Sequence, residues 1–345
     1  MLVSVIVPCF NEEKVLQDTY RRLSAALPDG EDVQHEFVFV DDGSTDNTLA
    51  ILMHLATSDG RVNIVKLSRN FGHQPAVSAG IRYCHGDLAA IIDADLQDPP
   101  EVIPDMVAQL SATGSNVVYG VRTKRKGETL FKRAACSLFY RILSRLSDVP
   151  QPVNTGDFRV IDRRIIDLFN QLEERNKYVR GLISWMGFKQ TPFYYERDPR
   201  YAGIPKYTLK KLFGLASTGI FYFSKKPLQI STGFGFLSVA VGLVLSFWIL
   251  FNKLLNPTYL ISGWTSLILM IIYFGGVQLL TIGILGQYIG SLFDETKKRP
   301  EFIVDRTINY ASGQVRDAVP QARLSRQRRV PTAFFGTNDP LFPHS

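Results

Sequence analysis

The stretch "LVSVIVPCFNEEKVLQDTYRRLSAAL" (residues 2–27) joins a β-branched run to a segment whose apolar residues recur at helical spacing. The two patterns meet at the polar "PCFNEE". Further apolar runs follow, with helical patterns between them: "HEFVFVD", "RVNIVKL", "DLAAIID" and "NVVYGV". This alternation predicts an α/β domain with a mainly parallel sheet that is covered by helices on both faces.

Polar clusters follow the first four predicted strands. They are "PCFNEE", "DDGSTDNT", "SRNFGHQ" and "DADLQD", in chain order. Ligands of open α/β sheets bind beyond the carboxyl ends of the strands. The four clusters are therefore expected to converge on one edge of the sheet and to form the functional site there.

The composition fits a folded protein, because 46% of the 345 residues are hydrophobic and 21% are charged. A net charge of +7 suits nucleic acid, an anionic membrane or a phosphorylated ligand, and does not choose among them. The cysteines are Cys9, Cys84 and Cys136, and they show neither disulfide nor zinc-site spacing. We expect reduced thiols in the cytoplasm. No basic segment precedes "LVSVIVP", so no cleaved signal peptide is expected.

Two long stretches, 227–252 and 254–293, contain no Asp, Glu, Lys or Arg. About 20 apolar residues span a bilayer, so we predict a transmembrane hairpin near 231–252 and 264–290; two buried core helices are the alternative. Basic residues flank its outer ends (Lys225, Lys226 and 297–299), whereas the connecting loop has only Lys253. This asymmetry predicts an integral protein of the cytoplasmic membrane with its catalytic domain in the cytoplasm.

The remaining segments complete the predicted domain organisation. Residues 207–226 have near-helical apolar spacing between lysines, which fits a helix in the headgroup layer or a linker helix packed on protein. The predicted parts are a catalytic domain (1–200), an acceptor loop with the amphipathic helix (201–229), two transmembrane helices (230–292), a cytoplasmic segment (293–311) and a disordered tail (312–345).

Asp93 and Asp95 stand one residue apart after an apolar run. Two adjacent carboxylates repel each other, so a structure that keeps both ionised needs a compensating cation. Oxygen ligands suit a hard divalent ion such as magnesium, which completes its shell with substrate phosphates and water. An Asp-x-Asp pair alone is equally compatible with simple capping of a strand end.

The ordered motifs "VSVIVPCFNEE", "VFVDDGSTDNT", "NFGHQPAVSAG" and "DADLQDPPE" resemble family 2 glycosyltransferases with the GT-A fold. No Gly-x-Gly-x-x-Gly follows the first strand, which argues against a dinucleotide-binding domain. The segments "TGDFRVIDRR", "ERNKYVRGLISWMGF" and "RYAGIPKYTLKKL" narrow the resemblance to polyisoprenyl-phosphate glycosyltransferases, the group of dolichol-phosphate mannose synthase and bacterial undecaprenyl-phosphate glucosyltransferases. The similarity covers about residues 1–306. Pro205 departs from it, because the family usually has Ser or Thr there.

The resemblance implies an inverting enzyme that transfers a hexose, with glucose favoured, from a nucleotide sugar such as UDP-glucose to a polyisoprenyl phosphate such as undecaprenyl phosphate. The product is a lipid-linked sugar of the cell envelope, made at the cytoplasmic face of the membrane. A processive polysaccharide synthase and a non-catalytic membrane scaffold that kept the fold are the alternatives. We also expect a homo-oligomer and no nucleic-acid partner.

For the donor, the resemblance implies that Asp95, Asp93 and Gln97 hold Mg²⁺ or Mn²⁺ against the diphosphate. The nucleotide sugar would be bound by Pro8, Glu12, Asp42 and Asp93, with Asp42 as an acceptor for the base. Glu12 and Asp42 are otherwise readable as helix N-caps.

For the acceptor, the resemblance points to Arg122, Arg133 and Ser137 as ligands of the lipid phosphate. Asp157 matches the position of a general base, although a phosphate already ionised at pH 7 hardly needs one. Orientation of Arg159 or Lys206 is the other role open to Asp157. Arg200 and Lys206 would neutralise the diphosphates as a loop closes, which places them with Asp95 and Asp157 in the catalytic set.

Overall fold

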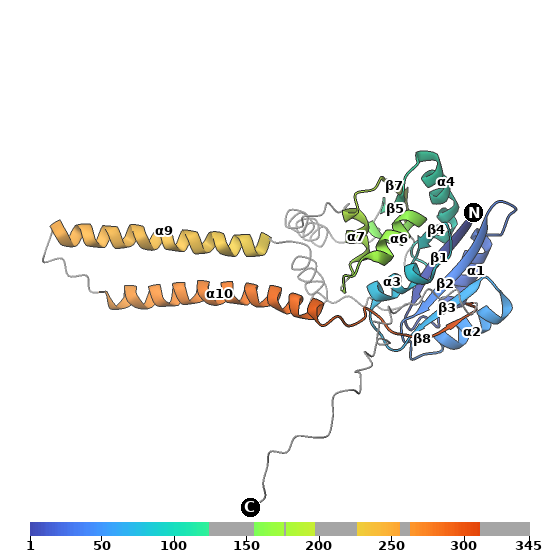
Figure 1. The fold of residues 1–345 in the computed structure, drawn as a ribbon, viewed down its shortest axis with the longest axis horizontal. Helices are drawn as coiled ribbons and strands as arrows, with labels where there is room; N and C mark the ends of the chain where they lie inside the picture. The colour runs from blue at the N-terminus through green and yellow to red at the C-terminus, as the bar shows by residue number, and fades with distance from the viewer. Residues whose placement is uncertain (124–154, 176, 197–225, 256–262, 311–345) are drawn as a thin grey trace, which may run out of the picture. The chain divides into compact units, whose positions relative to one another are not determined.

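The computed structural model describes residues 1–123, 155–175, 177–196, 226–255 and 263–310. These residues form one eight-stranded sheet in the order β7-β5-β6-β4-β1-β2-β3-β8 (Figure 1). The strands are β1 (Leu2–Cys9), β2 (Gln34–Asp41), β3 (Val62–Leu67), β4 (Leu88–Ile91), β5 (Val117–Arg122), β6 (Thr155–Asp162), β7 (Gln190–Tyr195) and β8 (Val304–Ile308). Four pairings are parallel, namely β1 with β2 and β4, β2 with β3, and β5 with β7. The predicted mainly parallel α/β sheet is confirmed.

Helices cover both faces of the sheet. On one face lie α1 (Leu16–Ala26), α2 (Thr48–Ser58), η1 (Pro100–Val102) and α4 (Ile103–Thr113). On the other lie α3 (His73–Tyr83), α6 (Arg163–Gln171) and α7 (Val179–Trp185). The alternation of side chains along β1 explains both layers. Val3, Val5 and Val7 pack with the first layer, while Ile6 faces Gly80 of α3.

The antiparallel pairing of β4 with β6 brings the start of β6 to the functional edge. Ile91 lies opposite Arg159, so the residues that precede Arg159 lie beside those that follow Ile91. The "TGDFR" segment therefore reaches the same edge as "DADLQD". The sequence pattern did not predict this strand, because three of its residues, Asp157, Arg159 and Asp162, are charged.

The strand β8 comes from the segment 293–311, which the sequence pattern places outside the catalytic domain. It pairs antiparallel with β3, and Lys66 forms a 2.7 Å ion pair with Asp305. Asn309 donates to the carbonyl oxygens of Ala56 and Val62, both at 2.8 Å. A segment that follows the second long apolar helix thus completes the edge of the catalytic sheet.

Two long apolar helices, α9 (Lys226–Leu255) and α10 (Trp264–Thr296), contact each other. Two stretches in them, Lys226–Asn252 and Met270–Thr296, have the length and composition of membrane spans, with mean hydropathies of 2.3 and 1.5. In an apolar 18-residue window of each stretch, only 6% and 0% of the residues are buried inside the protein. The apolar surface is therefore exposed, which does not fit the alternative of buried core helices.

The loop after β2 packs on the loop after β3 through Gly43. Gly43 has a φ of 66°, and a Cβ at this position would lie 2.5 Å from the carbonyl carbon of Arg69 and 2.7 Å from the nitrogen of Asn70. Both the backbone conformation and the close approach exclude a side chain. Gly43 therefore sets the distance between two of the polar clusters.

We expect Gly43→Ala to lower the free energy of unfolding by about 1–3 kcal/mol, because alanine is strained at positive φ and collides with backbone atoms. Denaturant titration of the purified protein measures this loss. Gly60→Ala is the matched control, since a Cβ there meets nothing within 4 Å. Equal stability of the two variants would show that the loop packing is not as tight as described.

Candidate active site

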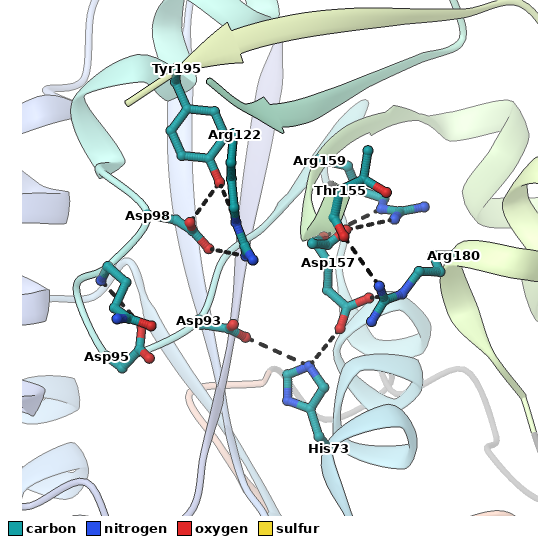
Figure 2. A network of polar contacts seen from close by, with 12 residues as sticks. His73, Asp93, Asp95, Asp98, Arg122, Thr155, Asp157, Arg159, Arg180 and Tyr195 are labelled. Carbon is teal, nitrogen blue, oxygen red and sulfur yellow. Dashed lines mark hydrogen bonds and ion pairs between the residues drawn. The ribbon is translucent and has the colours of Figure 1, made fainter. Parts of the chain in front are cut away.

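His73 joins the ends of β4 and β6 across the functional edge (Figure 2). It is the first residue of α3, and its Nε2 lies 3.1 Å from Oδ2 of Asp157 and 3.6 Å from Oδ1 of Asp93. Burial alone would lower the pKa of His73, but the hydrogen bond to Asp157 and the charge of Asp93 outweigh it and raise the pKa to about 9. At neutral pH a cationic imidazole therefore bridges the two carboxylates.

Asp157 is enclosed by groups that favour its ionised form. Its side chain is 10% exposed, and Arg180 approaches Oδ1 with Nε at 3.3 Å. Gln74 donates to Oδ2 at 3.2 Å and accepts from the backbone of Val179, which fixes its amide. Burial would raise the pKa of Asp157, but Arg180 and His73 overcome that effect and hold the pKa well below its usual range. Asp157 is thus a permanent anion near neutral pH.

The backbone around Asp157 is held by Arg159. This guanidinium is 3% exposed and donates to the carbonyl oxygens of Gly156, at 3.1 Å, and Asp157, at 3.3 Å. Burial lowers the pKa of Arg159 to about 10, which leaves it cationic at pH 7. Arg159 therefore stabilises the backbone of β6 by hydrogen bonds, whereas His73 and Arg180 contact the carboxylate of Asp157 itself.

Asp93 is the site carboxylate whose ionised form is disfavoured by its surroundings. Its side chain is 32% exposed. Burial of its carboxylate raises the pKa to about 6, the charges of Asp157, Asp98 and Asp95 act in the same direction, and only His73 opposes them. Asp95 accepts from the backbone N–H of Gln97 at 3.2 Å, and Leu96 between them has a φ of 58°. The chain thus turns within the segment that carries both carboxylates, as binding of one ion by both requires.

The donor set at this turn fits a hard divalent cation. The carboxylates of Asp93 and Asp95 and the amide oxygen of Gln97 are the ligand types that Mg²⁺ and Mn²⁺ take. Within the part of the chain that the structure describes, no three His, Cys, Asp or Glu side chains are grouped to hold a metal ion. A bound ion would therefore draw further ligands from substrate oxygens and water.

Arg122, at the end of β5, is held by two neighbours. Nη2 of Arg122 lies 3.4 Å from Oδ2 of Asp98, and its Nε donates to the hydroxyl of Tyr195 at 3.3 Å. That hydroxyl in turn donates to Oδ1 of Asp98 at 2.6 Å. Figure 2 shows the guanidinium reaching into the space between Asp98 and Asp157. The predicted acceptor ligand is thus fixed at the same edge as the carboxylates.

Of the residues predicted to bind the nucleoside, Glu12 and Asp42 lie on the loops after β1 and β2. Pro8 is a buried residue of β1. Asp42 is 3% exposed and accepts from the backbone N–H groups of Phe71, at 2.7 Å, and Gly72, at 2.9 Å. Burial raises the pKa of Asp42, although these two hydrogen bonds oppose the shift. In this structure Asp42 anchors the loop that leads to His73, and its contact with a base stays a prediction.

The capping alternative does not describe these loops. Val15 is the N-cap residue of α1 and Asn47 that of α2, and neither makes a side-chain cap hydrogen bond. Glu12 instead donates its backbone N–H to Thr48 at 2.9 Å. This hydrogen bond joins the two loops, and Val15 and Asn47, rather than Glu12 and Asp42, occupy the N-cap positions of α1 and α2.

Four predicted site residues lie outside the described residues: Arg133, Ser137, Arg200 and Lys206. The predicted amphipathic helix and tail lie there as well, apart from Lys226 at the start of α9. Five residues at the site received no role from the sequence: His73, Gln74, Asp98, Arg180 and Tyr195. His73 and Gln74 do fall in the "SRNFGHQ" cluster, and Asp98 ends "DADLQD". Their position after a strand was the available signal.

Comparisons with known proteins identify the family. The family model described as "Glycosyl transferase family 2" matches residues 4–169. A protein of Bacillus subtilis (strain 168) named "Uncharacterized glycosyltransferase YkcC" is 46% identical over 304 residues, covering 88% of this chain and 93% of that protein. The chain belongs to glycosyl transferase family 2. As a family 2 glycosyltransferase it has the GT-A type of fold that the motifs predicted, and the prediction of an enzyme is confirmed.

Further relatives of this family 2 glycosyltransferase match along most of their length. The "SfII prophage-derived bactoprenol glucosyl transferase" of Shigella flexneri is 37% identical over 312 residues, covering 89% of this chain and 98% of that protein. Among solved structures, the mannosyltransferase PcManGT from Pyrobaculum calidifontis, in complex with GDP-Man and Mn²⁺, aligns with a TM-score of 0.44 and 16% identity. That alignment covers 85% of this chain and 86% of the other.

Proposed function

We propose that this glycosyltransferase transfers glucose from UDP-glucose to a polyisoprenyl phosphate such as undecaprenyl phosphate, with inversion at the anomeric carbon. An oxygen of the lipid phosphate forms the new bond to that carbon. The bond from the carbon to the diphosphate oxygen breaks, and its electron pair leaves with the nucleoside diphosphate. The full-length similarity to a protein named bactoprenol glucosyl transferase supports the choice of sugar and acceptor.

The observation that carries the proposal is the meeting of two kinds of charge at one sheet edge. Asp93 and Asp95 are suited to a metal-bound diphosphate, while Arg122 is suited to a second phosphate. His73 lies between Asp93 and Asp157, at 3.6 and 3.1 Å, and so separates the donor side of the site from the acceptor side. A reaction between two phosphate-bearing substrates needs this arrangement, because each must be bound without its charge repelling the other.

On the donor side, we assign Asp93, Asp95 and Gln97 to the divalent cation and Pro8, Glu12 and Asp42 to the nucleoside. When bound, the ion offsets the charge that develops on the leaving diphosphate. The protein's own contribution is to carry Asp93 and Asp95 in one short segment that turns at Leu96 (Figure 2). Arg200 and Lys206, outside the described residues, stay assigned to the diphosphates.

On the acceptor side, we assign Arg122 to the lipid phosphate, together with Arg133 and Ser137, which lie outside the described residues. Asp157 has the role of orienting His73 and Arg180. Its lowered pKa makes it a poor proton acceptor, because a general base works best with a pKa near the pH of the reaction. The phosphate itself ionises with a second pKa near 6 by analogy with phosphoamino acids, so the nucleophile is already formed.

We further propose that α9 and α10 cross the cytoplasmic membrane, with the catalytic domain in the cytoplasm. Apolar side chains exposed around both helices, such as Phe236 at 74% and Leu279 at 72%, need a lipid environment. Lysines and an arginine at the outer ends of the hairpin favour the cytoplasmic side for both ends. A homo-oligomer remains part of the proposal.

Transfer of radiolabel from UDP-glucose into an organic-extractable lipid tests the function. Undecaprenyl phosphate is the acceptor and nucleotide sugars with other hexoses are the comparison. Transfer from another hexose in preference to glucose would revise the donor. Insoluble polymer would point to a processive synthase, and no product with any donor would point to a scaffold.

We expect Arg122→Ala to raise the KM for undecaprenyl phosphate by about 10- to 100-fold, because a charge-assisted contact of about 1.5–3 kcal/mol is lost. The KM for UDP-glucose is expected to stay nearly unchanged. Arg21→Ala is the matched control, since the side chain of Arg21 lies on α1 and is 77% exposed. Equal losses for both substrates would place Arg122 in the donor pocket instead.

A further inference from the structure

The guanidinium of Arg122 is enclosed by two polar groups that also contact each other. Arg122 approaches Asp98 at 3.4 Å and the Tyr195 hydroxyl at 3.3 Å, while Tyr195 and Asp98 are 2.6 Å apart. Asp98 is 1% exposed and Arg122 is 17% exposed at the side chain. Arg122, Asp98 and Tyr195 therefore each contact the other two. These contacts fix the Arg122 guanidinium near the surface, while Asp98 is shielded from water.

The ring of Tyr195 is itself held in a fitted slot. It packs edge-on against Phe158 with ring centroids 5.4 Å apart, and it passes over Gly120, where a Cβ would lie 2.7 Å from its Cε1. Tyr195 is 5% exposed. Because the ring cannot shift in this slot, its hydroxyl is directed at Asp98 and Arg122.

Gly156 forms the third side of the enclosure. A Cβ added there would collide with Nη2 of Arg122. The guanidinium thus lies against the backbone that precedes Asp157. Since the colliding atom is the far end of a flexible side chain, an added methyl group would displace the guanidinium and leave the backbone in place.

We propose that Tyr195 and Asp98 are positioning residues of the acceptor half of the site, and that Gly156 leaves the room into which they hold the Arg122 guanidinium. This inference rests on the proposed function, because Arg122 is taken as a ligand of the acceptor phosphate. Tyr195 and Asp98 act through Arg122 and need no contact with the substrate. Their effect is therefore confined to one substrate.

The first test compares Tyr195→Phe with Tyr194→Phe in the full-length enzyme. Tyr194 is the neighbour on β7 and is 65% exposed, so its hydroxyl is the matched control. Loss of one hydrogen bond to Arg122 is expected to raise the KM for undecaprenyl phosphate about fivefold in Tyr195→Phe. The kcat and the KM for UDP-glucose are expected to stay near those of the wild type. Equal effects on both substrates, or no effect, would overturn the proposal.

A double mutant separates positioning from a general structural role. In the Arg122→Ala background, Tyr195→Phe is expected to have no further effect on the KM for the lipid, because Tyr195 has lost the group through which it acts. A persistent fivefold effect would contradict the inference.

Gly156→Ala provides a second route that removes no polar group, and it is expected to raise the same KM in the direction of Arg122→Ala with an unchanged melting temperature. An unchanged KM in Gly156→Ala would also count against the proposal.

Labelling of arginine by phenylglyoxal gives a readout that needs no turnover. Peptide mass spectrometry follows modification of Arg122, which is expected to react severalfold faster in Tyr195→Phe and Gly156→Ala than in the wild type or Tyr194→Phe. If the wild type makes no glucolipid while this labelling difference is present, the proposed function fails and the positioning stands. Unchanged labelling in both variants would overturn the positioning, whatever the activity.

Discussion

Asp95→Ala is expected to lower the rate of glucose transfer by about 10²- to 10³-fold, the loss typical when charge stabilisation of a transition state is removed. The physical reason is the crowding of carboxylates at the end of β4. Asp98, Asp95 and Asp157 all raise the pKa of Asp93, which reaches about 6 mainly through burial. In the proposed function, a divalent ion would relieve this repulsion and contact the diphosphate, with Asp95 as its second carboxylate ligand.

Two measurements separate this metal role from a loss of folding. Binding of Mn²⁺, followed by electron paramagnetic resonance, is expected to weaken in Asp95→Ala together with activity. EDTA is expected to abolish transfer by the wild type, and added Mg²⁺ or Mn²⁺ to restore it. Asp105→Asn is the matched control, because Asp105 is an exposed carboxylate of α4. Full activity in EDTA, with no Mn²⁺ bound, would refute the assignment of Asp93 and Asp95.

Strands β1 to β5 were predictable because their signals are local. From β1 to β5, each strand is an apolar run followed by a polar cluster or a helix, and that pattern needs no distant partner to be recognised. Strand β6 carries Asp157, whose charge is compensated by Arg180 from another part of the chain. Strand β8 has only five residues, two of them charged. Such strands are set by tertiary pairing rather than by their own pattern.

The location of the site was predictable, but its contacts were not. Parallel strands bring their carboxyl ends to one edge, so the polar clusters had to meet there. The bridge between His73 and Asp157 joins residues 84 positions apart, and it depends on the antiparallel placement of β6. The contact of Arg122 with Tyr195 depends in the same way on the parallel pairing of β5 with β7. The strand pairing and its register decide both contacts, and neither can be read from the sequence pattern.

Asp157→Asn is expected to lower kcat by about 10²-fold, and the deficit is expected not to shrink between pH 5.5 and pH 8. The size follows from the cost of misplacing groups at a reaction centre, because the neutral amide of the variant no longer attracts His73 and Arg180 by charge. The absence of recovery at high pH follows from the lowered pKa of Asp157, and His73, which loses the hydrogen bond that raises its pKa, becomes less cationic as the pH rises. A carboxyl whose pKa lies well below its usual range is ionised across this whole window, so its charge does not change with pH.

A general base would give a different profile. If Asp157 removed a proton from a monoanionic acceptor, the variant would lose most at low pH, where more of the phosphate carries its second proton. The deficit would then shrink as the pH rises through the second pKa of the phosphate, near 6. A pH–rate profile at saturating concentrations of both substrates distinguishes the two roles. A deficit that shrinks severalfold between pH 5.5 and 8 would establish the base.

Arg180→Gln provides the matched variant for this profile, because Arg180 contacts Oδ1 of Asp157 while His73 contacts Oδ2 (Figure 2). Loss of that guanidinium removes one of the charges that lower the pKa of Asp157. If Asp157 only orients, Arg180→Gln is expected to lower kcat by a nearly pH-independent factor, because His73 keeps its hydrogen bond to Asp157 and stays cationic. If Asp157 were a base, the same change would raise its pKa toward that of the phosphate and would improve proton transfer. The two roles therefore predict opposite signs for kcat at low pH, which makes this pair of variants decisive.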